Sequence, residues 1–439
     1  MTPKTSKSDG IISILAKEPS FALVMLYIVT WWTQLSERWA QRTGGVRIEA
    51  ILVALLLVFV CLTLSSKRKE VKDKAGFTPY VILYFAVLLL QVVNSWDSTR
   101  SWFIFTERVL KYSLMALFIS HFTDSTDKLK LIIFAYLFSC FKITQEGVLG
   151  GITGSLVWYN QGIPRLHGST EMYGHPNSLS QLALGTLPFI YYLFPLMKKL
   201  WLKVSLLILL SFSIYCIIYT GSRTGYLGAI CMASLVFWKA SRKNKKRILL
   251  AFMILIPLLV MYTPNAYKHR FDSTFSENEA EGHSKEHRIR MYGEGWDIFL
   301  KNPLGVGIGN YVLANYKYNG YRQEVHCLYL EALTHIGIQG FIIFMLLIAK
   351  IFSVFKKLEK TFKELISRAK TRVDWTNQLD ELKFLQATMR SLYVYFLLRL
   401  FVDIFGMDLY GICWWFTIGI ASALTCLANR IMRQMNQLT

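Results

Sequence analysis

Long apolar runs alternate with short polar segments along the whole chain. A membrane-spanning α-helix needs about 20 predominantly apolar residues, and most of these runs reach or approach that length. They cover residues 20–33, 47–64, 79–94, 101–121, 130–145, 177–197, 202–219, 224–239, 248–263, 326–355, 386–404 and 410–429. The pattern predicts an all-α integral membrane protein of about twelve transmembrane helices, forming a single polytopic membrane domain over residues 1–439. The first run is the shortest, and the N-terminus would change sides if it did not span.

The composition agrees with this class. The chain is 53% hydrophobic and only 18% charged, whereas soluble domains carry roughly a quarter charged residues. The net charge of +21 is concentrated in short basic clusters between the apolar runs, which is how membrane proteins fix their orientation, so we expect no nucleic-acid partner. The seven cysteines are scattered singly, with no C-x-x-C pair, and predict neither a zinc site nor a disulfide framework.

The basic clusters predict the orientation of the chain. The order of the runs puts three clusters on one side: Lys67, Arg68, Lys69, Lys72 and Lys74; Lys198, Lys199 and Lys203; Arg242, Lys243, Lys245, Lys246 and Arg247. The positive-inside rule makes that side cytoplasmic, together with both termini. The segment 356–385 lies on the same side and reads as a charged cytoplasmic linker helix, in which Glu359 and Lys363 have helical pair spacing.

The opposite, external side receives two longer loops, 146–176 and 264–325. The second is the only stretch long enough to hold structured, water-facing polypeptide, and loops of more than about 15 residues are usually functional or disordered. Its aromatic residues favour order: Tyr292, Trp296, Phe299 and Tyr311. We therefore expect short helices that lie at the membrane surface.

The external side also collects an unusual set of polar residues. Those that could bind a substrate are Arg165, His167, His175, Arg223, Arg288 and Arg290. The positive-inside rule predicts few arginines on this side, so those present need a reason. Guanidinium groups at a membrane surface suit bidentate capture of phosphate. The alternative is pairing with lipid headgroups or with acidic groups of the loop, namely Glu277, Glu279, Glu281 and Asp297.

His326 opens the tenth run, at the point where the polar loop ends. A histidine at such an interface is wet on one side and apolar on the other, and it can serve as a general base near neutral pH. The alternative is a histidine that only caps the helix or extends toward the interface. Glu331 and His335 lie further along the same run and could contact a polar interior.

Several familiar motifs are absent. The sequence contains no G-x-x-x-x-G-K-[ST], no H-E-x-x-H and no D-x-D for a metal-bound nucleotide sugar. The GVGIGN at 305–310 is expected to form a turn, because it lies on the external side, where no ATP is available. Chemistry on that side must therefore draw its energy from the substrate itself.

Two motifs carry a resemblance to a known family. The combination of R-x-x-x-L (Arg223 to Leu227) with H-x10-G-x-x-G (His326, Gly337, Gly340) resembles the bacterial O-antigen ligase and polysaccharide polymerase superfamily. The stretch RLHGSTEMYGHPNSLSQ at 165–181 and the loop's RIRMYGEGWDIFLKNPLGVGIGNY are also similar to it. Cys327 departs from the family, which usually has Asn, Ser or Gln after the histidine.

The resemblance implies a GT-C-like, metal-independent enzyme without a cofactor, active at the periplasmic face of the bacterial inner membrane. It would transfer a glycan from undecaprenyl diphosphate to an acceptor hydroxyl, with inversion at the anomeric carbon. The acceptor is lipid A-core in ligases and another lipid-linked glycan in polymerases, and the sequence does not distinguish the two. In this reading the arginines stabilise the leaving diphosphate, and His326 takes the acceptor proton.

A multi-pass transporter is the alternative of another class. It should carry polar or broken helices near the middle of the membrane. The main intramembrane charges are Glu107, Arg108 and Lys111 in the fourth run, and Glu107 and Lys111 have the spacing to pair within one helix. A structural role for this pair leaves transport the weaker alternative.

Overall fold

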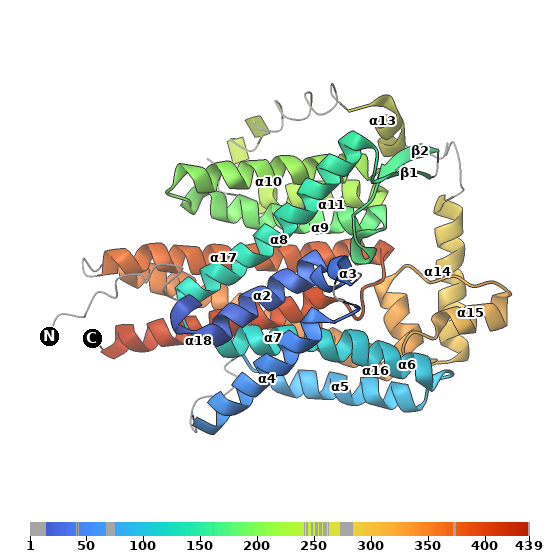
Figure 1. Cartoon of the computed structure of the whole chain (residues 1–439), viewed down its shortest axis with the longest axis horizontal. Coiled ribbons are helices and arrows are strands. Elements are labelled where there is room, and N and C mark those ends of the chain that lie inside the picture. Colours follow the sequence, from blue (N-terminus) through green and yellow to red (C-terminus); the bar gives the residue numbers. More distant parts are fainter. Residues whose placement is uncertain are drawn as a thin grey trace. The chain divides into compact units, whose positions relative to one another are not determined.

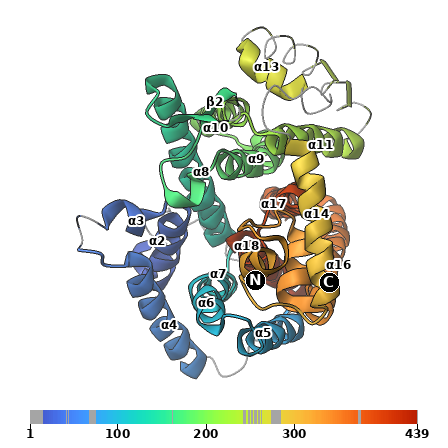
Figure 2. The same ribbon diagram turned by 90° about the vertical axis from the view of Figure 1, so that its right-hand side faces the viewer.

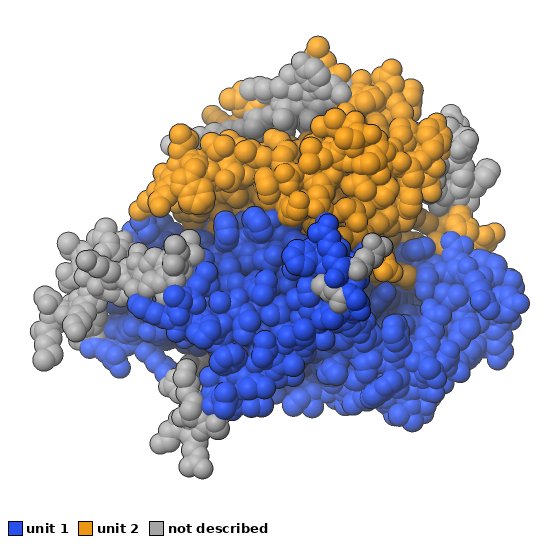
Figure 3. Space-filling model, in the orientation of Figure 1, with its two compact units in different colours: residues 1–139, 294–389, 408–439 blue, residues 140–293, 390–407 orange. Residues whose placement is uncertain are grey.

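The computed structural model forms two compact units, which are described separately (Figure 3). It describes residues 15–40, 42, 44–66, 75–160, 162–240, 242, 245, 246, 249, 250, 253, 257, 261, 263–272, 284–371 and 375–437. Unit 1 comprises Met1–Ser139, Glu294–Met389 and Asp408–Thr439, and unit 2 comprises Cys140–Gly293 and Arg390–Met407. Three helices contribute residues to both units: α8 (Thr126–Thr153), α14 (Ser284–Lys301) and α17 (Thr376–Val402).

Unit 1 is built from helices (Figure 1). Its elements are α2 (Pro19–Thr33), α3 (Leu35–Trp39), α4 (Ile48–Ser66), α5 (Thr78–Val93), α6 (Ser98–Ile104), the π-helix η1 (Phe105–Leu110), α7 (Lys111–Phe122), α15 (Tyr311–Asn319), α16 (Leu328–Lys370) and α18 (Ile412–Gln437). Asp97 is the N-cap residue of α6. Its carboxylate accepts a hydrogen bond from the Arg100 backbone N–H at 2.9 Å.

α18 is the central helix of unit 1. It packs against α7 and α16, and α16 in turn packs against α5 (Figure 2). Apolar residues cover nearly all of its sides, as expected of a helix that is surrounded by others. Phe416 lies between Trp32 and Tyr136, with ring centroids 5.7 and 4.8 Å away, so aromatic packing joins α2, α8 and α18 in one core.

Unit 2 combines a small hairpin with a group of helices. Its elements are β1 (Val157–Asn160), β2 (Ile163–Leu166), the 3₁₀ turn η2 (Glu171–Tyr173), α9 (Pro176–Leu193), η3 (Phe194–Leu196), α10 (Leu200–Tyr219), α11 (Arg223–Lys239), α13 (Asn265–Asp272) and the 3₁₀ turn η5 (Asp403–Phe405). α9 packs against both α10 and α11. α10 is strongly apolar yet mostly exposed, which is what a lipid-facing helix requires.

The predicted helical membrane class agrees with the structure. Within the described residues, the apolar runs fall mainly on helices, and five of these helices are long and apolar enough to cross a membrane: Thr126–Thr153, Pro176–Leu196, Leu200–Tyr219, Leu328–Lys370 and Ile412–Gln437. The first run corresponds to α2, which has only 15 residues and spans about 22 Å. Twelve spans, the GT-C-like arrangement and the orientation in the membrane stay predictions.

Some features of the sequence lie outside the described residues. They are the basic cluster Lys67, Arg68, Lys69, Lys72 and Lys74, the residues Lys243 and Arg247, most of the run 248–263, and the loop acids Glu277, Glu279 and Glu281.

The two segments that the sequence singled out as water-facing contain helices. α13, α14 and α15 lie within 264–325. Residues 356–385 fall on the end of α16 and the beginning of α17, and Glu359 and Lys363 form an ion pair of 3.3 Å on α16. The β1–β2 hairpin was not predicted, because its four-residue strands are too short to give a clear alternation of apolar and polar positions.

Candidate functional site

Arg165 is a buried arginine held by the backbone of unit 2. It lies on β2, opposite Trp158 of β1, and is 4% exposed. Its Nε donates to the Thr220 carbonyl at 2.9 Å and its Nη2 donates to Asn177 Oδ1 at 3.2 Å. Burial, opposed in part by Tyr226 and assisted by the positive charges of Arg223 and Arg288, lowers the pKa of Arg165 to about 10. The guanidinium therefore remains charged at neutral pH, close to two other arginines.

Arg223 is the first residue of α11, and its position is fixed by the residue before it. Ser222 caps the helix, because its Oγ accepts a hydrogen bond from the Gly225 N–H at 3.2 Å. The same Oγ donates to Asn177 Oδ1 at 2.9 Å. Asn177 Oδ1 thus accepts hydrogen bonds from both Ser222 and Arg165. The N-terminus of α11, which carries partial positive charge, is joined in this way to the buried arginine.

The glycines of GSRTGYLG explain why this helix can begin here. Gly221 has φ +55°, a conformation that L-amino acids with side chains rarely adopt. A Cβ at Gly225 would overlap the Ser180 side chain, and a Cβ at Gly228 would overlap Leu184, both on α9. The motif therefore combines a sharp turn before Arg223 with close packing of α11 on α9.

Arg270 is a further member of the site that the sequence reading missed. It lies on α13, is 8% exposed, and its Nε is 3.5 Å from the Gly221 carbonyl. Arg270 and Arg165 both act electrostatically on Tyr226 of α11. Arginine is expected to be rare on the external side, and this signal could have found Arg270 as well. We call Arg165, Arg223, Arg270 and Arg288 the arginine cluster.

Arg288 and Arg290 of α14 differ in their surroundings. The Arg288 guanidinium lies over the Phe405 ring, 5.7 Å from its centroid, and its charge acts on Arg165. Arg290 is exposed, and its Nη2 lies 2.9 Å from His287 Nδ1. Residues two positions apart point to different sides of a helix. The structure therefore brings Arg288 together with Arg165 and gives Arg290 a different environment.

His167 and His175 both lie beside Trp158. Their ring centroids are 5.0 and 6.2 Å from the indole. His167 Nδ1 is 2.9 Å from the Gly168 carbonyl, and His175 caps α9 by accepting from the Asn177 N–H at 3.2 Å. Both histidines thus lie in the segment between Arg165 and Asn177, and His175 has a structural role there as a helix cap.

His326 belongs to unit 1 and has a different setting. It is exposed, and it lies between two buried residues, Val325 and Cys327. Its φ of +46° is in the left-handed region, which is uncommon for a residue with a side chain and costs of order 1–3 kcal/mol. Cys327 is the N-cap residue of α16 and its side chain makes no cap hydrogen bond. The chain therefore presents an exposed imidazole at a left-handed turn just before α16.

The two other ionisable residues at the start of α16 are committed to packing. Glu331 is 5% exposed, and its Oε2 accepts a hydrogen bond from the Leu409 N–H at 3.1 Å. His335 is 3% exposed, and its Nδ1 lies 3.0 Å from the Tyr410 hydroxyl and 3.4 Å from the Gly309 nitrogen. Both connect α16 to the segment before α18, as the predicted contacts with a polar interior require.

A break in α16 explains the H-x10-G-x-x-G spacing. Gly337 has φ +67° and ψ −178°, which interrupts the helix. The residues of GVGIGN fill the gap: the Val306 N–H donates to the Thr334 carbonyl at 2.8 Å and the Ile338 N–H donates to the Pro303 carbonyl at 2.9 Å. Its glycines also have positive φ, between +72° and +97°. GVGIGN is thus a turn that satisfies the backbone of the broken helix, which agrees with the sequence reading.

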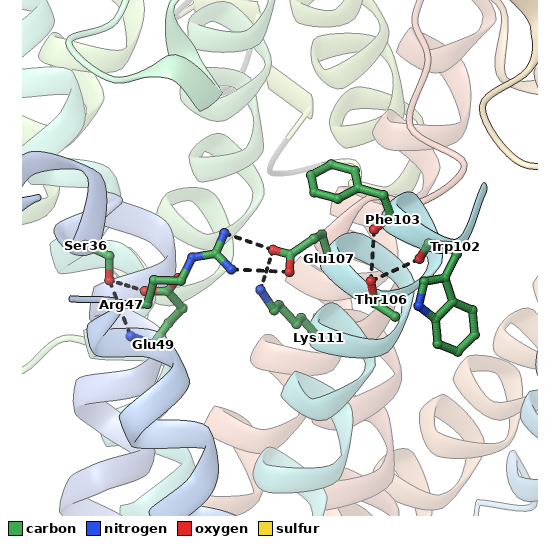
Figure 4. A network of polar contacts seen from close by, with 8 residues as sticks. All are labelled: Ser36, Arg47, Glu49, Trp102, Phe103, Thr106, Glu107 and Lys111. Carbon is green, nitrogen blue, oxygen red and sulfur yellow. Dashed lines mark hydrogen bonds and ion pairs between the residues drawn. The ribbon is translucent and has the colours of Figure 1, made fainter. Parts of the chain in front are cut away.

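Two charges of the fourth run, Glu107 and Lys111, form an ion-pair network with Arg47 (Figure 4). Glu107 pairs with Lys111 one turn further along, and Arg47 Nη2 lies 3.1 Å from Glu107 Oε2. The pairing of Glu107 with Lys111 was expected from their spacing. Arg47, just before α4, supplies a second cation. The network therefore connects the start of α4 to the π-helix η1 and to α7, which is a structural role.

Within the described part of the chain, no group of three or more His, Cys, Asp or Glu side chains is arranged to hold a metal ion.

Comparison with known proteins gives one finding. Residues 206–345 match the family model described as O-antigen ligase. The match includes Arg223, Arg270, Arg288, Arg290 and His326, together with both motifs that carried the resemblance. It supports the O-antigen ligase family and an enzyme of the ligase or polymerase type. A search of curated proteins gives no match.

Proposed function

We propose, from the O-antigen ligase match over residues 206–345, that this chain is a glycan ligase of the bacterial inner membrane. It would transfer a glycan from undecaprenyl diphosphate to a hydroxyl of lipid A-core, at the periplasmic face, with both termini in the cytoplasm. The observation that carries the proposal is that one matched segment contains three arginines of the arginine cluster, Arg223, Arg270 and Arg288, and an exposed histidine just before a helix. These are the two groups that such a transfer needs.

The arginine cluster is suited to the donor. Cleavage of the bond between the anomeric carbon and the diphosphate oxygen leaves the electron pair on that oxygen. Arg223 lies at the N-terminus of α11, and the charges of Arg223 and Arg288 both act on Arg165. Together these residues offer guanidinium groups and helix N–H groups to the negative charge that develops on the leaving oxygen. Because these donors are fixed before the reaction, they need little reorganisation as the charge develops.

Arg290, His167 and His175 are assigned weaker parts in this proposal. Arg290 is exposed beside His287 and would contribute long-range attraction rather than contact with the diphosphate. Trp158, which contacts the rings of His167 and His175, offers an aromatic face beside polar groups. Such a surface suits a sugar, which presents both C–H and hydroxyl groups, so we assign the two histidines to binding of the glycan.

His326 is suited to the acceptor. An exposed imidazole can accept the proton of the attacking hydroxyl while that oxygen forms its bond to the anomeric carbon. A single direct displacement of this kind inverts the anomeric carbon. Metal-independent action is proposed because the sequence lacks H-E-x-x-H and D-x-D and because the arginines can stabilise the leaving group.

A polymerase that joins lipid-linked repeat units remains the second candidate, since the family match supports both types of enzyme. The same arginines and the same base would serve, with a second lipid-linked glycan as the acceptor. The closed ion-pair network at Glu107 gives transport no specific support.

The test is transfer by the purified protein in proteoliposomes that contain lipid-linked glycan and lipid A-core. The proposal predicts glycosylated lipid A-core, formed equally well in the presence of a chelator. Longer glycan chains on the lipid carrier would instead identify a polymerase. In a deletion strain, a ligase leaves bare core together with free lipid-linked polymer, whereas loss of a polymerase leaves core bearing one repeat unit. Absence of both reactions in the proteoliposomes would contradict the proposal.

A further inference from the structure

A second pair of arginines lies in unit 1, outside the arginine cluster. Arg100 is on α6 and Arg108 is on the π-helix η1. In a regular α-helix, the directions of two side chains eight positions apart differ by about 80°. Here one α-turn of about 3.6 residues and one wider π-turn of roughly 4.4 residues together span eight positions, so the two side chains share a face. The irregular helix therefore aligns two cations.

The face shared by Arg100 and Arg108 is directed at Glu324, two residues before His326. Arg100 Nη2 lies 3.9 Å from Glu324 Oε1. Burial raises the pKa of the Glu324 carboxyl, and the positive charges of both Arg100 and Arg108 act in the opposite direction. Both arginines are thus within electrostatic range of one carboxylate, beside the proposed base.

Hydrogen bonds fix α6 to the segment that contacts α16. Ser101 Oγ donates to the Ile308 carbonyl at 2.8 Å, and Asn310 Nδ2 donates to Ser101 Oγ at 2.9 Å. The Trp96 N–H donates to the Val306 carbonyl at 3.1 Å. These contacts hold Arg100 against the turn that completes the broken helix of His326.

Glu324 neutralises this pair only in part. Its Oε1 is at the far limit of an ion pair with Arg100, and its Oε2 is buried without a hydrogen-bond partner among the described residues. One carboxylate also cannot fully neutralise two guanidinium groups. An ion pair at this long distance contributes little to stability, and a buried carboxylate oxygen without a donor is unfavourable. A stronger anion could therefore displace the carboxylate.

We propose that Arg100 and Arg108 form a binding site for a phosphate group carried by the acceptor, and that Glu324 occupies this site when the acceptor is absent. The assignment to the acceptor rests on the proposed function, in which His326 on the same unit receives the acceptor proton. A phosphate bound two residues from the base would hold the acceptor hydroxyl near the imidazole. Anionic lipid headgroups also carry a phosphate group and are the other possible source of the bound phosphate.

Binding is measured first, because it does not depend on catalysis. Glucose 6-phosphate and glucose are titrated separately against the detergent-purified full chain, and binding is followed by calorimetry. The proposal predicts that the wild type binds the phosphorylated sugar and that Arg100→Gln/Arg108→Gln weakens this binding by about tenfold or more. Arg322→Gln is the matched control. Arg322 is an exposed arginine two residues before Glu324, and its guanidinium lies over the Tyr316 ring.

Glu324→Gln gives a result of opposite sign. It removes the competing negative charge and keeps the shape of the side chain, so binding of glucose 6-phosphate should strengthen several-fold. Weaker binding in Glu324→Gln would contradict the proposal, as would wild-type binding in the double arginine variant or absence of binding in the wild type. Loss of binding in Arg223→Gln, with binding intact in the double variant, would show that the phosphorylated sugar binds in unit 2 and would contradict the proposal.

Kinetics then separate the acceptor from the rival source. In proteoliposomes, the double variant should raise KM about tenfold for phosphorylated lipid A-core and leave KM unchanged for the dephosphorylated acceptor and for the donor. If the effect appears only in vesicles with phosphatidylglycerol and disappears in phosphatidylcholine, the ligand is a lipid headgroup and the acceptor assignment is wrong. If the wild type transfers no glycan, the proposed function fails, while the binding measurement still decides whether the site exists.

Discussion

Arg165 in unit 2 and His326 in unit 1 differ in how the protein holds them. Arg165 is 4% exposed and is bonded to a backbone carbonyl and to Asn177, which also accepts from Ser222. His326 is exposed, at a left-handed turn just before α16. Burial has not removed the charge of Arg165, because a guanidinium has a very high intrinsic pKa. A histidine buried to the same degree would lose its proton readily.

The difference matches the two tasks. A group that stabilises a permanent or developing charge benefits from fixed orientation and partial burial, since electrostatic interactions strengthen away from water. A group that gains and loses a proton at neutral pH needs access to its substrate and a pKa near that pH. The buried alternatives in unit 1, Glu331 and His335, are already bonded to Leu409 and Tyr410 and lack that access.

The largest effect is expected from His326→Ala. Removal of a positioned general base costs about a hundred- to ten-thousand-fold in turnover, and the exposed position means that the fold should be retained. Turnover is measured with saturating donor and acceptor in proteoliposomes. His121→Gln is the control, because His121 lies on α7, beside Thr63, outside the proposed site. Near-normal turnover in His326→Ala would show that the base is another group.

Arg223→Lys is expected to lower kcat/KM about a hundredfold. The charge is kept, but an ammonium cannot make the two parallel hydrogen bonds of a guanidinium, and loss of one preorganised donor costs about a hundred- to a thousand-fold. The measurement is initial rate against donor concentration. Wild-type kinetics in the lysine variant would mean that Arg223 supplies only charge or is structural.

Gly337→Ala should act on stability. A side chain is unfavourable at φ +67°, and the added Cβ would overlap the Leu304 carbonyl group. We expect the free energy of unfolding to fall by about 2 kcal/mol or more, seen as a lower midpoint of thermal unfolding in detergent. The control is Gly293→Ala, where the Cβ would contact nothing within 4 Å and the helix is continuous. Equal midpoints for the two variants would refute the role of the break.

The smallest effect is expected from Arg290→Gln. Its guanidinium is exposed and contacts His287, so kcat/KM should stay within about threefold of the wild type at physiological salt. Steady-state kinetics at two salt concentrations check this. A loss as large as that of Arg223→Lys would mean that α14 presents Arg290, rather than Arg288, to the substrate.

Periodicity and motif spacing predicted the helical membrane class and the positions of the described helices. They also identified Arg165, Arg223 and Arg288, which the structure relates electrostatically. Asn177 and Arg270 could not be assigned to the same place, because they are 93 positions apart and only tertiary packing joins them through α9, α11 and α13. The π-helix has no clear sequence signal, since its extra residue changes the helical phase without changing hydrophobicity.

The most direct test of the division of roles is the dissociation constant for the lipid-linked donor, measured in parallel for His326→Ala and Arg223→Lys. The account predicts binding within about threefold of the wild type for His326→Ala, despite its much lower turnover, and binding weakened about tenfold or more for Arg223→Lys. Loss of donor binding in His326→Ala would make the histidine a phosphate ligand and would contradict the assignment of diphosphate to the arginines and of the proton to His326.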